Sequence, residues 1–174
     1  KGGLEAAVFS ARSFVHGIVG AGVLVKVDAT NAFNSISRTA VGAAVAADVP
    51  EALPYFSSAY GAESFLFFGG FVLRSAAGVQ QGDPLGPLLF ALGLVSVLRA
   101  VACPFRGGYL DDLFLGGPPG VCAASFVELE TALAAIDLTV SRAKSQVVVG
   151  SLCPDTLALD GLFPAASFLQ ADSW

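Results

Sequence analysis

The sequence predicts an α+β fold in which an antiparallel sheet carries helices packed on one face. Two observations support this prediction. β-rich runs joined by short turns occur at residues 64–75 and 108–115, and each run indicates a hairpin. Segments with apolar residues at helical spacing separate these hairpins from two further strand patterns. Strands and helices therefore interleave along 174 residues, a suitable length for one domain with a substantial core.

The first third of the chain predicts a strand between helices. Residues 1–20 have the spacing of a weakly amphipathic helix. The stretch GVLVKVD is typical of a buried strand, which would end at Asp28. Residues 31–50 predict a helix, and a second short helix would follow at 51–60. One face of the longer helix would carry Phe33, Ile36, Ala40 and Ala44.

The remaining segments predict two hairpins, two helices and a strand. SFLFFGGFVLRS would turn through its glycine pair, and RGGYLDDLFLGG would turn at Asp111 and Asp112. Between them, DPLGPLLFALGLVSVLRAV predicts a helix that is apolar nearly all round and would be the central core helix. A helix over 121–137 and the strand SQVVVG would follow, whereas residues 152–174 carry no interpretable pattern.

Composition excludes several classes of protein. Hydrophobic residues make up 55% and charged residues 13% of the chain, so disorder is not expected. The longest apolar run, LLFALGLVSVL, is too short to span a membrane. The amino terminus lacks the pattern of a secretory signal, and three cysteines without metal-ligand spacing predict a reduced intracellular protein. Because the chain contains no methionine, we expect it to be a piece of a longer protein. Its net charge of −5, taken alone, disfavours a nucleic-acid partner.

Three aspartates are the best candidates for chemistry. Lys26 and Asp28 share one face of their strand, and Asp28 would lie at its carboxyl end, where it could also be a solvated acid or a helix cap. Asp111 and Asp112 could simply be turn residues, but adjacent carboxylates repel each other and a divalent cation would reverse that repulsion. Carboxylates suit Mg²⁺ rather than zinc, and two such ions can promote phosphoryl transfer. The single histidine, His16, is more typical of a surface residue than of a base.

Four segments together resemble the catalytic motifs of reverse transcriptases. They are VKVDATNAFN, GVQQGDPLGPLLFAL, GYLDDLFLGG and LTVSRAKSQVV, and they occur in the family's order between Val23 and Gly150. The second segment resembles the corresponding motif of the non-LTR retrotransposon branch of the family. The resemblance implies a polymerase palm with a ferredoxin/RRM-like core. The chain would be a single palm domain, and residues 1–22 could be the last part of the fingers. Complete fingers and a thumb would lie outside the chain.

The resemblance also implies roles for the aspartates. Asp28 and Asp111 would be the main ligands of two Mg²⁺ ions, with Mn²⁺ as a substitute, and Asp112 would be the neighbouring acid. The backbone carbonyl of Ala29 would complete one metal's shell. Lys144 would be the general acid that protonates pyrophosphate, although a solvated lysine in a turn would look the same.

The other implied residues would contact the nucleotide, the template or the primer. Phe33 would be the steric gate against a ribose 2′-hydroxyl, although its spacing also suits a core residue. Gln81 and Gly82 would line the nucleotide and template side, with glycine allowing a close backbone approach. Tyr109 would lie beside the primer end.

The fourth segment departs from the family pattern. Ser141 stands where asparagine is usual, and Asp137 where glycine is usual. Both departures weaken the assignment of Lys144 and could mark sequence decay.

The implied activity is RNA-directed DNA polymerisation, with an RNA template, a DNA primer and dNTPs as partners. The resemblance implies no membrane partner, and it implies that the parent protein is nuclear. The alternatives are a decayed or domesticated domain with a structural role and an RNA-dependent RNA polymerase palm, which Phe33 disfavours.

Overall fold

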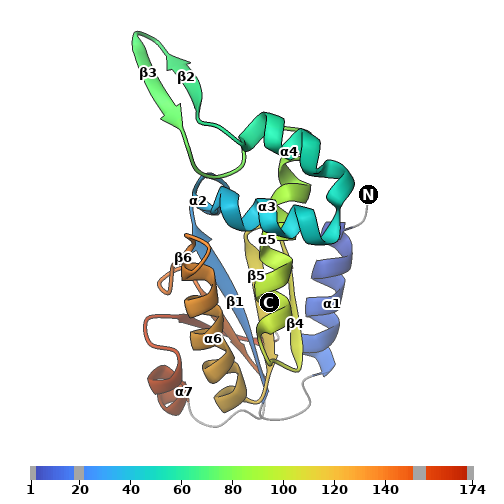
Figure 1. The fold of residues 1–174 in the computed structure, drawn as a ribbon. Coiled ribbons are helices and arrows are strands. Elements are labelled where there is room, and N and C mark those ends of the chain that lie inside the picture. Colours follow the sequence, from blue (N-terminus) through green and yellow to red (C-terminus); the bar gives the residue numbers. More distant parts are fainter. Residues whose placement is uncertain (1–2, 18–21, 151–155, 172–174) are drawn as a thin grey trace.

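A six-stranded sheet forms the centre of the molecule in this computed structural model, which describes residues 3–17, 22–150 and 156–171 (Figure 1). The strands lie in the order β4-β5-β1-β7-β8, and β6 pairs with the end of β1. Every pair is antiparallel except β7 with β8, which corrects the prediction of a purely antiparallel sheet. The strands are β1 (Val23–Thr30), β4 (Phe105–Tyr109), β5 (Asp112–Gly117), β6 (Thr139–Val140), β7 (Gln146–Val149) and β8 (Ser167–Gln170).

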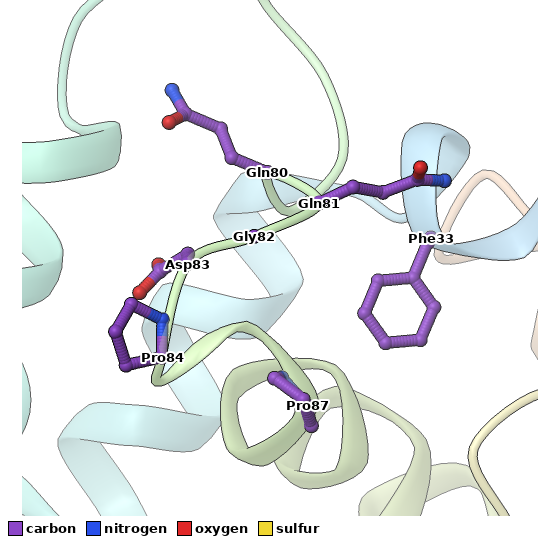
Figure 2. Close-up of a pocket in the computed structure, with 7 residues that line it drawn as sticks. All are labelled: Phe33, Gln80, Gln81, Gly82, Asp83, Pro84 and Pro87. Atoms are coloured by element: carbon purple, nitrogen blue, oxygen red, sulfur yellow. The ribbon is translucent and has the colours of Figure 1, made fainter.

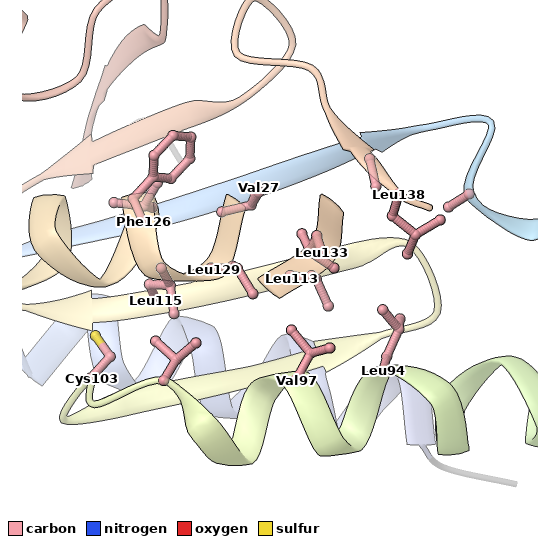
Figure 3. Close-up of a cluster of buried hydrophobic side chains, with 14 of the residues drawn as sticks. Val27, Leu94, Val97, Cys103, Leu113, Leu115, Phe126, Leu129, Leu133 and Leu138 are labelled. Atoms are coloured by element: carbon pink, nitrogen blue, oxygen red, sulfur yellow. The ribbon is translucent and has the colours of Figure 1, made fainter. Parts of the chain in front are cut away.

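The main hydrophobic core lies between one face of this sheet and three helices, α3 (Arg38–Asp48), α5 (Gly86–Ala100) and α6 (Pro119–Ala134). Alternation along β1 turns Val23, Val25 and Val27 toward these helices, and all three are fully buried. Figure 3 shows Val27 in the same buried cluster as Leu129 and Leu133 of α6, which packs on this face of the sheet. Helix α5 was predicted to be the central core helix, apolar nearly all round. The structure buries it on one side only, and Leu88 on its outer side is exposed.

Helix α1 (Gly3–Gly17) packs on the opposite face of the sheet (Figure 1). Its Ala11 and Val15 contact Leu24, Phe114 and Val148, which alternate with the residues that face the main core. The prediction that helices cover only one face is therefore wrong. Periodicity identifies an amphipathic helix but does not say which face of a sheet will receive it.

A glycine in β5 allows α1 to approach the sheet. A Cβ atom at Gly116 would lie 2.4 Å from the ring of Phe14, closer than side-chain carbons approach one another. That ring also stacks on Phe105 of β4, with centroids 4.6 Å apart. Gly116, in the second glycine pair of RGGYLDDLFLGG, thus has a packing role.

The predicted helix over 31–50 is two helices, α2 (Ala32–Ser35) and α3, with an extended residue, Ile36, between them. The backbone amides of Gly78 and Val79 donate to the carbonyls of Ile36 and Phe33, at 3.0 and 2.8 Å. These carbonyls bond to a distant loop instead of continuing a helix, which ends α2. The short helix predicted next is present as a 3₁₀ turn (Pro50–Ala52) and α4 (Leu53–Tyr60).

The first predicted hairpin is confirmed as β2 (Ser64–Phe68) and β3 (Phe71–Ser75), with Gly69 at a positive φ of 57°. It forms a separate two-stranded sheet that projects away from the central one (Figure 1). Its phenylalanines are exposed on both faces.

The segment without a sequence pattern contributes α7 (Thr156–Leu162) as well as β8. Within the described ranges, no helix has the length and apolar character needed to cross a membrane.

Candidate active site

Three of the predicted site residues lie in one row across the sheet. Asp112 on β5 is the register partner of both Asp28 on β1 and Tyr109 on β4. Directly opposed residues in antiparallel strands project from the same face. Because Val27 faces the main core, the row Tyr109–Asp112–Asp28 projects from the other face, beyond the part that α1 covers.

Asp111 lies in the turn that joins β4 to β5. Since Tyr109 pairs with Asp112, the two turn residues are Leu110 and Asp111, which corrects the prediction of an Asp111–Asp112 tip. The positive φ of the turn falls on Leu110, at 55°, a conformation that costs an L-residue roughly 1–2 kcal/mol. The strained turn leaves Asp111 exposed at the tip and puts Asp112 inside the strand.

The side chain of Asp112 is already paired. The ammonium of Lys26 lies 2.9 Å from its Oδ1 atom. Lys26, two residues before Asp28 in β1, therefore forms an ion pair with Asp112. Among the residues whose positions are described, no three acidic, histidine or cysteine side chains gather into a cluster that could hold a metal ion. The row therefore brings two aspartates opposite each other without bringing all three carboxylates together.

The turn after β6 fixes the backbone of Asp28 on both sides. The amide of Asp28 donates to the hydroxyl of Ser145 at 3.3 Å, and its carbonyl accepts from the amide of Ser141 at 2.8 Å. Ser145 is fully buried and its hydroxyl in turn donates to the carbonyl of Ser141. Sequence reasoning missed Ser145, because its hydrogen bond to Asp28 joins residues 117 positions apart in the chain.

The two departures from the family pattern have local explanations. Asp137 adopts a φ of 63°, a left-handed conformation that glycine favours and that aspartate tolerates better than most residues. Ser141 supports Asp28 through its backbone amide, which any residue except proline can supply. Lys144 lies in the same turn with its side chain exposed, and Ala29 is buried beside Asp28.

The residues predicted for the nucleotide side meet at one pocket (Figure 2). Its volume is about 470 Å³, and it is lined by Phe33, the loop 80–84 and Pro87. Gly82 has a φ of 95°, and a Cβ atom there would meet nothing within 4 Å. This backbone conformation alone favours glycine, and the close approach of a nucleotide or template at Gly82 stays a prediction. Phe33 is half-buried and stacks on Phe90 of α5, with centroids 4.3 Å apart.

A hydrogen-bond network behind the pocket holds its loop in place. The carboxylate of Asp83 accepts from the hydroxyls of Tyr55 and Tyr60 and from the amide of Leu85. The hydroxyl of Tyr60 also accepts from the amide of Gln80, at 3.1 Å. Burial raises the pKa of Asp83, but the tyrosine and amide hydrogen bonds outweigh it and lower the pKa overall.

Arg38 supports the segment that leads into this loop. Its guanidinium donates to the backbone carbonyls of Ser75, Ala77 and Gly78 and lies 5.3 Å from the ring centroid of Tyr60. Sequence reasoning missed the arginine and both tyrosines, because each acts across 20 or more positions in the chain.

Replacing Tyr60 with phenylalanine should destabilise the fold by about 1–2 kcal/mol at pH 7, because Asp83 and Gln80 each lose a partner. Burial, with the Asp83 hydrogen bond, raises the pKa of Tyr60 to about 12. Because this pKa is higher in the folded state than in the unfolded state, where it is near 10, the neutral tyrosine stabilises the fold below pH 10. This contribution disappears as pH rises toward 12. The difference between the wild type and the variant in urea unfolding should therefore shrink between pH 10 and pH 12. A difference that stays constant would contradict the network.

Comparisons with known proteins agree with this geometry at the level of fold. No family model matches the chain. The retrotransposable element SLACS 132 kDa protein of Trypanosoma brucei gambiense is 34% identical over 124 residues, which are 63% of this chain and 10% of that protein. Apo telomerase from Candida tropicalis superposes with a TM-score of 0.64 over 87% of this chain and 33% of that chain, at 10% identity. The fold is that of a part of telomerase.

A second telomerase structure from Candida tropicalis, in complex with a TWJ fragment of telomeric RNA, matches 82% of this chain and 28% of that chain. Its TM-score is 0.55 and its identity 11%. The chain thus spans about a tenth of the retrotransposon protein and about a third of the telomerase chains. A retrotransposon relative and a telomerase fold agree with the resemblance of the four motifs to reverse transcriptases.

Proposed function

We propose that this chain is the palm of a reverse transcriptase from a non-LTR-type retroelement and that it takes part in RNA-directed DNA synthesis. The observation that carries the proposal is the row in which Asp28 lies opposite Asp112, with Asp111 in the adjoining turn. Residues 1–22 would end the fingers, and RNA template, DNA primer and dNTP would be bound by the longer parent protein.

The donor set suits Mg²⁺. Asp28 and Asp111 offer carboxylate oxygens that no described ion pair occupies, and hard oxygen donors are what this cation prefers. In the proposal these two residues hold the metal, together with the Ala29 carbonyl, while Asp112 is the less committed partner because Lys26 binds it. When bound, the metal ions would supply charge stabilisation for phosphoryl transfer.

The chain's own residues would position the substrates. Phe33, Gln81 and Gly82 would receive the incoming nucleotide at the pocket of Figure 2, and the Asp83 network would keep that loop rigid. Tyr109, in the same row as the aspartates, would lie beside the primer end. Lys144 would be the proton donor to pyrophosphate, from the turn that fixes Asp28.

Primer extension on an RNA template with Mg²⁺ tests the proposal, with the parent-length protein as the enzyme. DNA synthesis that depends on Asp28 and Asp111 would support it. A protein that binds template and primer but extends neither RNA-templated nor DNA-templated primers would favour the alternative, a decayed or domesticated domain.

Replacing Lys26 with methionine should strengthen Mn²⁺ binding by the chain about fivefold. The substitution removes a positive charge beside the metal-binding aspartates, worth about 1 kcal/mol at about 4 Å in water. Because the Lys26 and Asp112 side chains are 31% and 44% exposed, the solvent-screened value applies. Titration followed by electron paramagnetic resonance measures the change, and Arg99→Met, which removes a charge from α5, is the control. Equal or weaker binding in Lys26→Met would argue against a metal at this row.

A further inference from the structure

Beside the aspartate row, the sheet forms one wall of a second pocket, of which the function proposed above uses only Asp112. Its volume is about 260 Å³. Two residues of α1, Val8 and Arg12, line it on one side, and the sheet supplies the rest: Lys26, Asp112, Phe114 and Gln146.

The sheet register explains why these side chains meet. Lys26 on β1 is the partner of Phe114 on β5 and of Gln146 on β7, so the three form a row of their own. This row lies two residues along β1 from Asp28, which corresponds to about 7 Å. The next row, which contains Leu24, is covered by α1. The pocket is therefore the gap between the end of the covered surface and the aspartates.

Positive charge exceeds negative charge in this pocket. Lys26 and Arg12 both line it, and the carboxylate of Asp112 is bonded to Lys26. Of the arginines in the described ranges, Arg12 is the one without a hydrogen bond or an ion pair. The others bind carboxylates or backbone carbonyls. The side-chain amide of Gln146 likewise has no bond to any other described residue.

We propose that this pocket binds a phosphate group of the primer strand, with Arg12 and Lys26 as its cationic contacts and Gln146 as a hydrogen-bond donor. The inference rests on the proposed function, because it assigns the pocket to the primer strand whose 3′ end would lie at the aspartates. A strand whose 3′ end lies at the aspartate row would extend back across the next row of the sheet. The distance of about 7 Å between rows corresponds to about two stacked nucleotides, at about 3.4 Å per phosphate along one strand.

The same pocket offers an apolar wall for the sugar. Phe114 is nearly buried at its base and Val8 lies at its rim, so a sugar edge could pack there while the phosphate faces the cations. This arrangement also meets the objection from net charge. An acidic chain can hold a nucleic-acid strand if the few cations that face it are concentrated at the contact.

The test is binding of a fluorescein-labelled primer annealed to an RNA template, followed by anisotropy with the parent-length protein at several salt concentrations. Arg12→Gln should weaken binding roughly threefold to tenfold at low salt and reduce the slope of log affinity against log salt by about one. Arg99→Gln makes the same change in net charge on another part of the surface and should leave both quantities unchanged. Circular dichroism melting checks that both variants remain folded.

The outcome distinguishes the strand from a free phosphate compound. If binding of inorganic pyrophosphate or a dNTP depends on Arg12 and binding of the primer does not, the pocket serves the nucleotide. The assignment to the primer strand is then wrong. Equal losses in Arg12→Gln and Arg99→Gln, no loss in either, or no binding of the duplex by the wild-type parent-length protein would also overturn it. A shift of the Arg12 Nε–H signal in NMR spectra on adding the primer would locate the contact directly.

The proposed function and this inference can fail separately. Asp111→Asn should abolish extension while leaving duplex binding and its dependence on Arg12 intact. If the wild-type parent-length protein extends no primer but Arg12→Gln still weakens duplex binding, the polymerase assignment fails and the phosphate site stands. Normal extension by Asp111→Asn would overturn only the role of Asp111 as a metal ligand. If extension requires Asp111 but Arg12→Gln changes neither primer affinity nor the KM for primer, the phosphate site fails alone.

Discussion

Replacing Asp111 with asparagine should lower primer extension by the parent-length protein about a thousandfold, with little change in stability. Asp111 is exposed in the turn between β4 and β5 and has no ion pair among the described residues, so folding does not depend on its charge. As a metal ligand it would contribute several kcal/mol of transition-state stabilisation, and each 1.36 kcal/mol corresponds to a tenfold change in rate. Single-turnover extension with saturating Mg²⁺ measures the loss.

Two matched variants sharpen this expectation. Asp137→Asn changes another exposed acid, in a left-handed conformation that asparagine also tolerates, and should leave the rate unchanged. Asp112→Asn should cost less than Asp111→Asn, since Lys26 already binds that carboxylate. The reverse order, with Asp112 essential and Asp111 dispensable, would show that the division of roles between the two residues is wrong.

Replacing Phe33 with alanine should reduce discrimination against ribonucleotides by about a hundredfold. Phe33 lines the pocket that also contains Gln81 and Gly82, and removing its ring would open space for a 2′-hydroxyl. Exclusion by the shape of an apolar pocket is typically worth 10- to 200-fold. The ratio of kcat/KM for dCTP to that for CTP is the measurement, and Phe33→Tyr should preserve it because the ring stays in place.

Phe33 also packs on Phe90, so a purely structural role has to be separated from a gate. Phe126→Leu offers the comparison, because Phe126 is buried in the main core against Phe163, away from the pocket residues. Both variants should lower the melting temperature, but only Phe33→Ala should change the nucleotide ratio. A lower melting temperature with an unchanged ratio would make Phe33 a core residue.

Local patterns predicted much of this fold. The buried run GVLVKVD located β1, β-rich runs joined by short turns located both hairpins, and period-two alternation placed Lys26 and Asp28 on one face. The meeting of Phe33 with Gln81 and Gly82 was expected from the family resemblance, and the pocket contains all three. Whether these residues act as proposed stays a prediction.

The errors arose where distant segments decide local structure. The break at Ile36 depends on amides near residue 78, which no window around residue 36 contains. The position of the turn depends on the pairing of Tyr109 with Asp112, which a preference for aspartate at turns could not supply. The Lys26–Asp112 ion pair likewise needs the register of two strands more than eighty positions apart.

The projecting hairpin β2–β3 has a consequence for solution behaviour. Four of its phenylalanines, Phe65, Phe67, Phe68 and Phe71, expose 61–79% of their surface, and they face both sides of the two strands. Apolar surface of this extent, next to unpaired strand edges, favours self-association of the isolated chain. Solubility is thus governed by a segment remote in the chain from the aspartates. Serine at Phe67 and Phe68, one on each side of the hairpin, would give a chain suited to measurements at high concentration.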